Sequence, residues 1–399
     1  MVAGSAALPR RVRGTVNQII HIITPEYPPE HGGVGDYTRG VARGLADAGD
    51  EVHVWCKTGG RGEPGDRFSV HPDFGRFSTR DLKHVGAALD RFQGPRRLIV
   101  QWVPHGFGYR AMNLRFCLWL WQRASMGDAV ELMVHEPYLA WKGTWRQAGA
   151  AAVHRVMTVV LLRAAQRVWV SIPAWEPMLK PYALGRAIPF GWLPIPSSLR
   201  EADAAAVAAV RALDKEDGRS VAGHLGTYSS LIAPLLSDVM VELLRQPEAP
   251  RVMLLGTGSQ QFARAFLAQR PEWTASVRAS GTLSDRDLAA HIAACHVMIQ
   301  PYPDGISSRR TTAMAALALG VPVITNTGAL SESIWRESGA VRLTEAGDSR
   351  GMAAQAIDVL NHPETRGALR ERGRALYALM FDVSRTIRAL HGADSGKAA

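Results

Sequence analysis

The chain has 399 residues, of which 47% are hydrophobic and 21% charged, and its formal net charge is +10. This length exceeds what one hydrophobic core usually holds, so we expect two domains, and the composition excludes fibrous and disordered classes. The three cysteines, Cys56, Cys117 and Cys295, have no paired spacing. They therefore favour a reducing, cytoplasmic setting over a disulfide framework or a zinc site.

The positive charge leaves several anionic partners open. Nucleic acid is the least favoured, because arginines are spread along the whole chain and no nucleic-acid-binding motif is present. No apolar run reaches about 18 residues, and the N-terminus lacks the apolar core of a signal peptide, so neither a membrane span nor secretion is predicted. An anionic substrate, peripheral contact with an anionic membrane surface, and a compositional bias without functional meaning all stay open.

In the first half, short apolar runs alternate with helical patterns, which indicates a parallel sheet covered on both faces. We expect strands at Ile19–Ile23, Glu51–Cys56, Leu98–Trp102, Glu131–His135 and Arg167–Ser171. Apolar residues at three-to-four spacing predict helices between them. These helices are expected at Gly40–Ala48, Met112–Ala124 and Ala151–Ala165.

Two prolines in Leu193–Arg200 (LPIPSSLR) cannot continue a helix or a central strand, so a domain boundary is predicted there. We expect one domain over residues 1–200 and another over 215–380. An alanine-rich helix, Glu201–Leu213, lies between them. Further strands are expected at Ser220–Leu225, Val252–Leu255, Val297–Gln300 and Pro322–Thr325. Further helices are expected at Gln261–Gln269, Ser284–Ala294, Arg309–Leu319, Met352–Leu360 and Glu364–Met380.

The segment Gln300–Thr325 contains, in order, a strand end, an acidic-glycine loop, a helix and a second buried strand. A doubly wound α/β domain binds its ligand at such a loop, so we expect contacts with an anionic ligand here. The predicted ligand-binding residues are Ser307, Ser308, Arg309, Arg310 and Thr312. Arginines at a helix start can grip a phosphate with two hydrogen bonds. Solvation of both, or pairing with Asp304, is the alternative.

Small-residue turns follow other predicted strands. Gly226-Thr227, Gly256-Thr257-Gly258 and Gly281-Thr282 would let a nucleotide approach the backbone. Gly32 and Gly33, in the loop PEYPPEHGGVG, could meet phosphates or hydroxyls at the start of a helix, although a packing turn without a ligand is also open. The loop has GGVG in place of GxGxxG, and the strand after its helix ends without an acidic residue, which argues against a nicotinamide site.

Together the two loops resemble the retaining glycosyltransferases of the GT-B fold, in the group 1, family 4-like superfamily. The resemblance implies two Rossmann-like α/β domains facing each other across a cleft. It implies transfer of a sugar, of hexosyl type, from a nucleotide-diphosphate sugar to a hydroxyl acceptor in polysaccharide, glycolipid or metabolite synthesis. It also implies no metal, no cofactor beyond the co-substrate, and a terminal helix within residues 381–399 that returns to the first domain before a disordered tail. The oligomeric state stays open.

The resemblance also assigns roles to particular residues. His135, at a strand end, would contact the reacting donor sugar, although a capping or structural histidine is the alternative, and Asp304 would hold donor hydroxyls. Acceptor contacts would come from the first domain, at Glu26, His31, Trp102 and His105. A flat ring such as that of Trp102 can stack on a sugar, but packing at a strand end is an equal alternative.

The chain departs from the family pattern at two places. Many members have a glutamate eight positions after the acidic loop residue, whereas this chain has Thr312, and Asp304 is one carbon shorter than the usual glutamate. Thr227–Pro234 (TYSSLIAP) has no basic residue where the family places an arginine and a lysine. A catalytically silent paralogue acting as a partner subunit, and a nucleotide-sugar epimerase, therefore stay open as alternatives.

Overall fold

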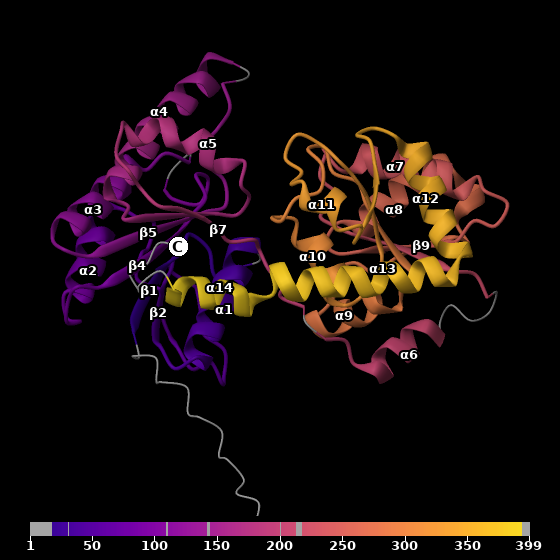
Figure 1. The fold of residues 1–399 in the computed structure, drawn as a ribbon, viewed down its shortest axis with the longest axis horizontal. Coiled ribbons are helices and arrows are strands. Elements are labelled where there is room, and N and C mark those ends of the chain that lie inside the picture. Colours follow the sequence, from indigo (N-terminus) through magenta and orange to yellow (C-terminus); the bar gives the residue numbers. More distant parts are fainter. Residues whose placement is uncertain are drawn as a thin grey trace, which may run out of the picture.

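The structure is a computed structural model that describes residues 18–30, 32–108, 111–141, 144–199, 201–212 and 218–392. Two separate parallel β-sheets each carry helices on both faces, and they lie side by side along the long axis of the molecule (Figure 1). The predicted α/β class, with two Rossmann-like domains, is confirmed. Among the described helices, none is long and apolar enough to cross a membrane.

The first sheet has the strand order β3-β2-β1-β4-β5-β6-β7, and all its paired strands are parallel. Its strands are β1 (Ile19–Ile23), β2 (Glu51–Trp55), β3 (Ser69–His71), β4 (Arg97–Trp102), β5 (Ala129–Val134), β6 (Arg167–Val170) and β7 (Phe190–Trp192). Its helices are α1 (Gly33–Asp47), α2 (Thr79–Leu89), α3 (Leu114–Ser125), α4 (Trp145–Ala164) and α5 (Trp175–Leu179). The central strand β4 is buried along its whole length, as expected for a strand covered on both faces.

The second sheet has the order β10-β9-β8-β11-β12-β13, again with parallel pairing. Its strands are β8 (Val221–Leu225), β9 (Arg251–Leu255), β10 (Val277–Ala279), β11 (Val297–Gln300), β12 (Val323–Asn326) and β13 (Arg342–Thr344). The helices around it are α6 (Ala204–Ala212), α7 (Ala233–Leu244), α8 (Ser259–Gln269), α9 (Asp285–Ala294), α10 (Thr311–Ala318), α11 (Ile334–Glu337), α12 (Ser349–Asn361) and α13 (Pro363–Leu376).

Several elements differ from the sequence expectations. Helix α1 begins at Gly33, not Gly40, because the Glu26 carboxylate accepts hydrogen bonds from the first amides of the helix. Helix α10 begins at Thr311, with Arg310 as its N-terminal cap residue, not at Arg309. The edge strands β3, β7, β10 and β13 and the helices α2, α5, α7 and α11 were not predicted.

The two domains touch where the loop before α10 meets the end of the first sheet and the chain that joins the domains. The Ser308 hydroxyl donates to the Ser171 carbonyl at 2.8 Å and accepts from Trp192 Nε1 at 3.1 Å, and Ile195 N donates to the Ser308 carbonyl at 2.9 Å. Ser308 is fully buried. The loop that opens α10 is thus fixed against the end of the first sheet.

The end of the chain returns to the first domain. Helix α13 continues through a π-helical turn, Tyr377–Phe381, into α14 (Val383–Gly392), which packs against α1 (Figure 1). Arg97 Nη2 donates to the Leu390 carbonyl at 2.8 Å, and His391 Nε2 lies 2.6 Å from Asp50 Oδ2. The helix therefore belongs to the core of the first domain. Residues 393–399, the expected disordered tail, lie outside the described residues.

Candidate functional site

Charged side chains meet where the carboxyl ends of the two sheets face the domain junction. Strand β5 is followed by His135 and Glu136, and β11 is followed by the loop that carries Asp304, Arg309 and Arg310. Arg309 Nη1 lies 3.8 Å from Glu136 Oε1, so this pair joins the two domains. The carboxyl end of a parallel sheet is where doubly wound domains bind ligands.

Asp304 pairs with both neighbouring arginines. Its Oδ2 atom lies 2.5 Å from Arg309 Nη2, and its Oδ1 atom contacts Arg310 Nη2. The Arg310 guanidinium also stacks over the Tyr302 ring at 4.5 Å. Burial lowers the pKa of both guanidiniums, but an arginine starts so far above neutrality that both stay charged. The pairing with Asp304 that the sequence left open is the arrangement observed.

His135 is buried at the end of β5. Its Nε2 atom lies 2.8 Å from Gln101 Oε1, and the edge of the Tyr37 ring packs against it at 5.0 Å. Burial lowers the pKa of His135 to about 3, so the imidazole is uncharged at neutral pH. It can exchange a hydrogen bond with a ligand, but it carries no positive charge there.

The other predicted residues of the acidic-glycine loop are engaged within the protein. The Thr312 hydroxyl lies 2.7 Å from the Tyr302 hydroxyl. The Ser308 hydroxyl and amide both contact the Glu332 carboxylate, in addition to the junction bonds described above. The Ser307 hydroxyl is buried and has no hydrogen-bond partner among the described residues. Phosphate binding by these residues stays a prediction.

The glycine turns of the second sheet follow the carboxyl ends of β8, β9 and β10. They lie side by side because these three parallel strands are neighbours. Gly226 N donates to the Leu255 carbonyl at 3.2 Å, which holds the turn after β8 against the end of β9. The Thr257 and Thr282 hydroxyls are 3.1 Å apart, joining the turns after β9 and β10. Gly256 and Gly258 both have positive φ, 98° and 89°. The structure thus brings the predicted turns together.

The first amides of α1, which were expected to meet phosphates or hydroxyls of a ligand, are bound by a side chain of the protein. Glu26 Oε1 accepts hydrogen bonds from Val34 N at 2.8 Å and Gly35 N at 3.1 Å. A Cβ atom on Gly32 would lie 2.2 Å from that same carboxylate oxygen. A carboxylate of the chain itself therefore occupies the N-terminus of the helix, which favours negative charge. His31 lies outside the described residues.

The two candidates after β4 have different surroundings. Trp102 is 2% exposed and stacks on Phe107 in the core, with ring centroids 5.3 Å apart. This is the packing role that the sequence left open, and an acceptor could not reach the ring without a rearrangement. His105 is half-exposed, and its Nε2 atom lies 3.6 Å from Glu136 Oε2.

Several residues at the junction were not predicted from the sequence. Glu136 is central, since it faces both His105 and Arg309; its position directly after His135 was the available signal. A cavity of about 320 Å³ lies between α1, the linker and the starts of α9 and α10. Asp36 and Arg39 line it from α1, and Thr311 lines it from α10. Within the described residues, no group of three or more His, Cys, Asp or Glu side chains could hold a metal ion.

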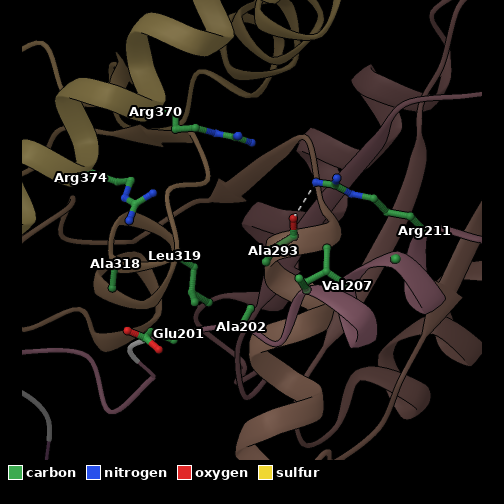
Figure 2. Close-up of a pocket in the computed structure, with 11 residues that line it drawn as sticks. Glu201, Ala202, Val207, Arg211, Ala293, Ala318, Leu319, Arg370 and Arg374 are labelled. Atoms are coloured by element: carbon green, nitrogen blue, oxygen red, sulfur yellow. Dashed lines mark hydrogen bonds between the residues drawn. The ribbon is translucent and has the colours of Figure 1, made fainter.

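A larger cavity, of about 770 Å³, lies elsewhere in the second domain, among α6, α9, α10 and α13 (Figure 2). Arg211, Arg370 and Arg374 extend into it, and Arg211 Nη2 donates to the Ala293 carbonyl at 3.1 Å. Ala293 is near the end of α9 and Leu319 caps the end of α10, where helix carbonyls attract cations. Arg211 thus has a structural role, and the cavity lies at the C-terminal ends of α9 and α10.

Comparison with known proteins defines the fold. Residues 222–362 match the family described as glycosyl transferases group 1, whereas no curated protein matches the chain. Sucrose-phosphate synthase from Thermosynechococcus elongatus superimposes with a TM-score of 0.72 and 16% identity, covering 94% of this chain and 98% of its own. Anabaena HepE in complex with UDP superimposes with a TM-score of 0.68 and 15% identity, covering 95% of this chain and 100% of its own. WaaG, a glycosyltransferase involved in lipopolysaccharide biosynthesis, superimposes with a TM-score of 0.66 and 14% identity, covering 95% of this chain and 100% of its own.

The chain therefore has the GT-B fold of these enzymes over nearly its whole length. The sequence match to the group 1 glycosyl transferases lies in the second domain, from β8 to the end of α12. It includes the glycine turns and the acidic-glycine loop.

Proposed function

We propose that the protein transfers a sugar from a nucleotide-diphosphate sugar to a hydroxyl acceptor, with retention of the anomeric configuration. The reaction would serve polysaccharide, glycolipid or metabolite synthesis in the cytoplasm. The observation that carries the proposal is that Arg309 meets Glu136, directly after β5, at the carboxyl edge of the second sheet, where the glycine turns also lie. The match of residues 222–362 supports it, as do the HepE complexes with UDP and UDP-glucose.

Each part of the junction has a chemical role in this proposal. The turns at Gly226 and Gly256 receive the nucleotide. Arg309 and Arg310 stabilise the charge that develops on the leaving diphosphate. That phosphate accepts the proton of the acceptor hydroxyl, so a retaining transfer needs neither a strong base nor a metal ion. Asp304 and the uncharged His135 orient the donor sugar, and Glu136 and His105 face the acceptor.

A catalytically silent partner subunit is the second candidate. It is favoured by Thr312, whose hydroxyl contacts Tyr302, and by the engagement of both arginines with Asp304. A silent protein could keep these internal contacts permanently, because no diphosphate would need to replace the carboxylate.

The test is incubation of the full chain with UDP-, GDP- and dTDP-sugars, with products followed by NMR. Slow release of free sugar is the expected result without an acceptor, and with a hydroxyl acceptor the glycosidic product should keep the donor's anomeric configuration. An inverted anomer overturns the retaining mechanism, and an epimeric nucleotide sugar identifies an epimerase. Absence of both binding and turnover favours the silent subunit. Parallel reactions with a chelator test the metal independence.

A further inference from the structure

Large apolar side chains are exposed in one part of the first domain. Trp121 is 49% exposed, Trp141 59% and Trp145 80%. Most of the exposed large hydrophobic residues in the described chain lie in this same part: Leu114, Leu118, Trp121, Met126, Trp141, Trp145 and Val156. Single exposed apolar residues are ordinary, but a concentration of this kind marks an interaction surface.

Five of these residues lie on the outer sides of two neighbouring helices, and Met126 and Trp141 lie next to the helix ends. On α3, Leu114, Leu118 and Trp121 recur at helical spacing, whereas Phe116 and Leu120 point into the core. On α4, the exposed positions Trp145, Gly149, Ala152 and Val156 are also apolar or small. Helix α3 packs against α4, so their outer sides belong to one layer of the domain. Figure 1 shows this layer on the first domain, away from the second domain. We call it the α3–α4 face.

Helices α3 and α4 contain five arginines and no acidic residue. Residues 91–175 contain eleven arginines and lysines but only three acidic residues. Of these three, Asp128 and Glu131 are buried, and Glu136 lies at the domain junction. Arginines also stack on the exposed tryptophans. The Arg155 guanidinium lies 4.1 Å from the centre of the Trp141 ring, and the Arg146 guanidinium lies 5.2 Å from the centre of the Trp145 ring. Within the described residues, α3 and α4 thus present aromatic rings and arginines, and the half-exposed Asp90 next to α3 is paired with Arg96 and Arg123.

We propose that the α3–α4 face binds the surface of an anionic lipid bilayer. Tryptophan is favoured at the membrane–water interface, where its ring is partly buried and its N–H stays hydrated. Arginines beside it are attracted to anionic headgroups. An isologous dimer through the same face would place these cations against each other without compensation, so a second copy of the chain fits less well. The proposal does not depend on sugar transfer.

The test is co-sedimentation of the full chain with vesicles of phosphatidylcholine alone and of phosphatidylcholine with phosphatidylglycerol. The protein should bind the anionic vesicles more tightly, and added salt should weaken that binding by screening. Trp121→Ala and Trp145→Ala should each lower the partition coefficient by about tenfold. Arg115→Gln and Arg146→Gln should each lower it by about fivefold.

Matched controls come from the second domain. Leu231 and Leu379 are 67% and 68% exposed, and Leu231→Ala and Leu379→Ala should leave vesicle binding unchanged. Equal binding to both kinds of vesicle overturns the proposal, as does a loss in the controls equal to that in the tryptophan variants. If light scattering shows a dimer that Trp121→Ala dissociates, and anionic vesicles bind neither form, the face is a contact between copies instead. Binding of nucleoside diphosphate in the tryptophan variants serves as the check that they are folded.

Discussion

If Arg309 and Arg310 grip the diphosphate, Asp304 competes with that ligand for both guanidiniums. Arg309→Ala or Arg310→Ala should then weaken binding of a nucleoside diphosphate, whereas Asp304→Asn should strengthen it. The opposite directions follow from the structure, because one carboxylate pairs with both arginines. If the two arginines bound the diphosphate without first pairing with Asp304, Asp304→Asn would not raise the affinity for the nucleoside diphosphate.

The magnitude follows from the contacts. A hydrogen bond to a charged group contributes about 1.5–3 kcal/mol, so losing one guanidinium should weaken binding by about tenfold to a hundredfold. The gain in Asp304→Asn is expected to be about tenfold, since an amide still accepts one hydrogen bond but no longer carries a charge. Lysine should restore binding only partly, because it lacks the planar fork of arginine.

The assay is calorimetric titration of each variant with UDP, GDP and dTDP, and with the matching uncharged nucleosides. Nucleoside binding should barely change, which separates a phosphate contact from general unfolding. Arg350→Gln is the control for a change of net charge, because Arg350 is exposed on α12. If both alanine variants are folded and bind the nucleoside diphosphate like the parent, or if Asp304→Asn binds it more weakly, residues other than Arg309 and Arg310 bind the diphosphate.

Two further predictions concern stability. Burial lowers the pKa of His135 and His21 to about 3, so the unfolded chain binds more protons than the folded chain between that pH and about 6.5. The free energy of unfolding should therefore fall as the pH drops below about 6.5, by about 1.4 kcal/mol per pH unit for each histidine, and His135→Gln should remove one such contribution in denaturant titrations. If the free energy of unfolding of His135→Gln has the same pH dependence as that of the parent, the lowered pKa of His135 is contradicted. Gly305 and Gly347 have nearly equal φ, 83° and 80°, but a Cβ on Gly305 would lie 2.2 Å from Gly328 N and one on Gly347 would meet nothing within 4 Å. Gly305→Ala should thus cost clearly more than the roughly 1 kcal/mol expected for Gly347→Ala, and equal losses in thermal unfolding would refute the close contact.

The sequence predicted the central strands of both sheets, but it did not predict the twelve-residue helix α7. Strand β11 was predicted with its observed bounds, because an apolar run between polar turns is a strong local signal. Strands β3 and β7 were missed because each has three residues at a sheet edge, where pairing depends on the neighbouring strand. Helix α2 was missed although it carries a local signal, the capping box formed by Ser78 and Asp81.

The candidate site was predicted less completely, because its chemistry depends on contacts between distant segments. The glycine turns were found, since each is a local pattern after a strand. The capping of α1 by Glu26 was not found, because the carboxylate reaches amides eight and nine residues away. The approach of Arg309 to Glu136 joins two domains, and no spacing in the sequence encodes it.

The return of α14 to the first domain has a consequence for synthesis on the ribosome. The first domain is discontinuous, since its last helix follows the whole of the second domain in the chain. The α14 residues Ile387 and Leu390 are buried, Leu390 almost completely. Until these residues emerge, the nascent first domain exposes the apolar side of α1, whereas the second domain is already complete. We therefore expect the second domain to reach its native state first, against the usual N-to-C order of domain folding.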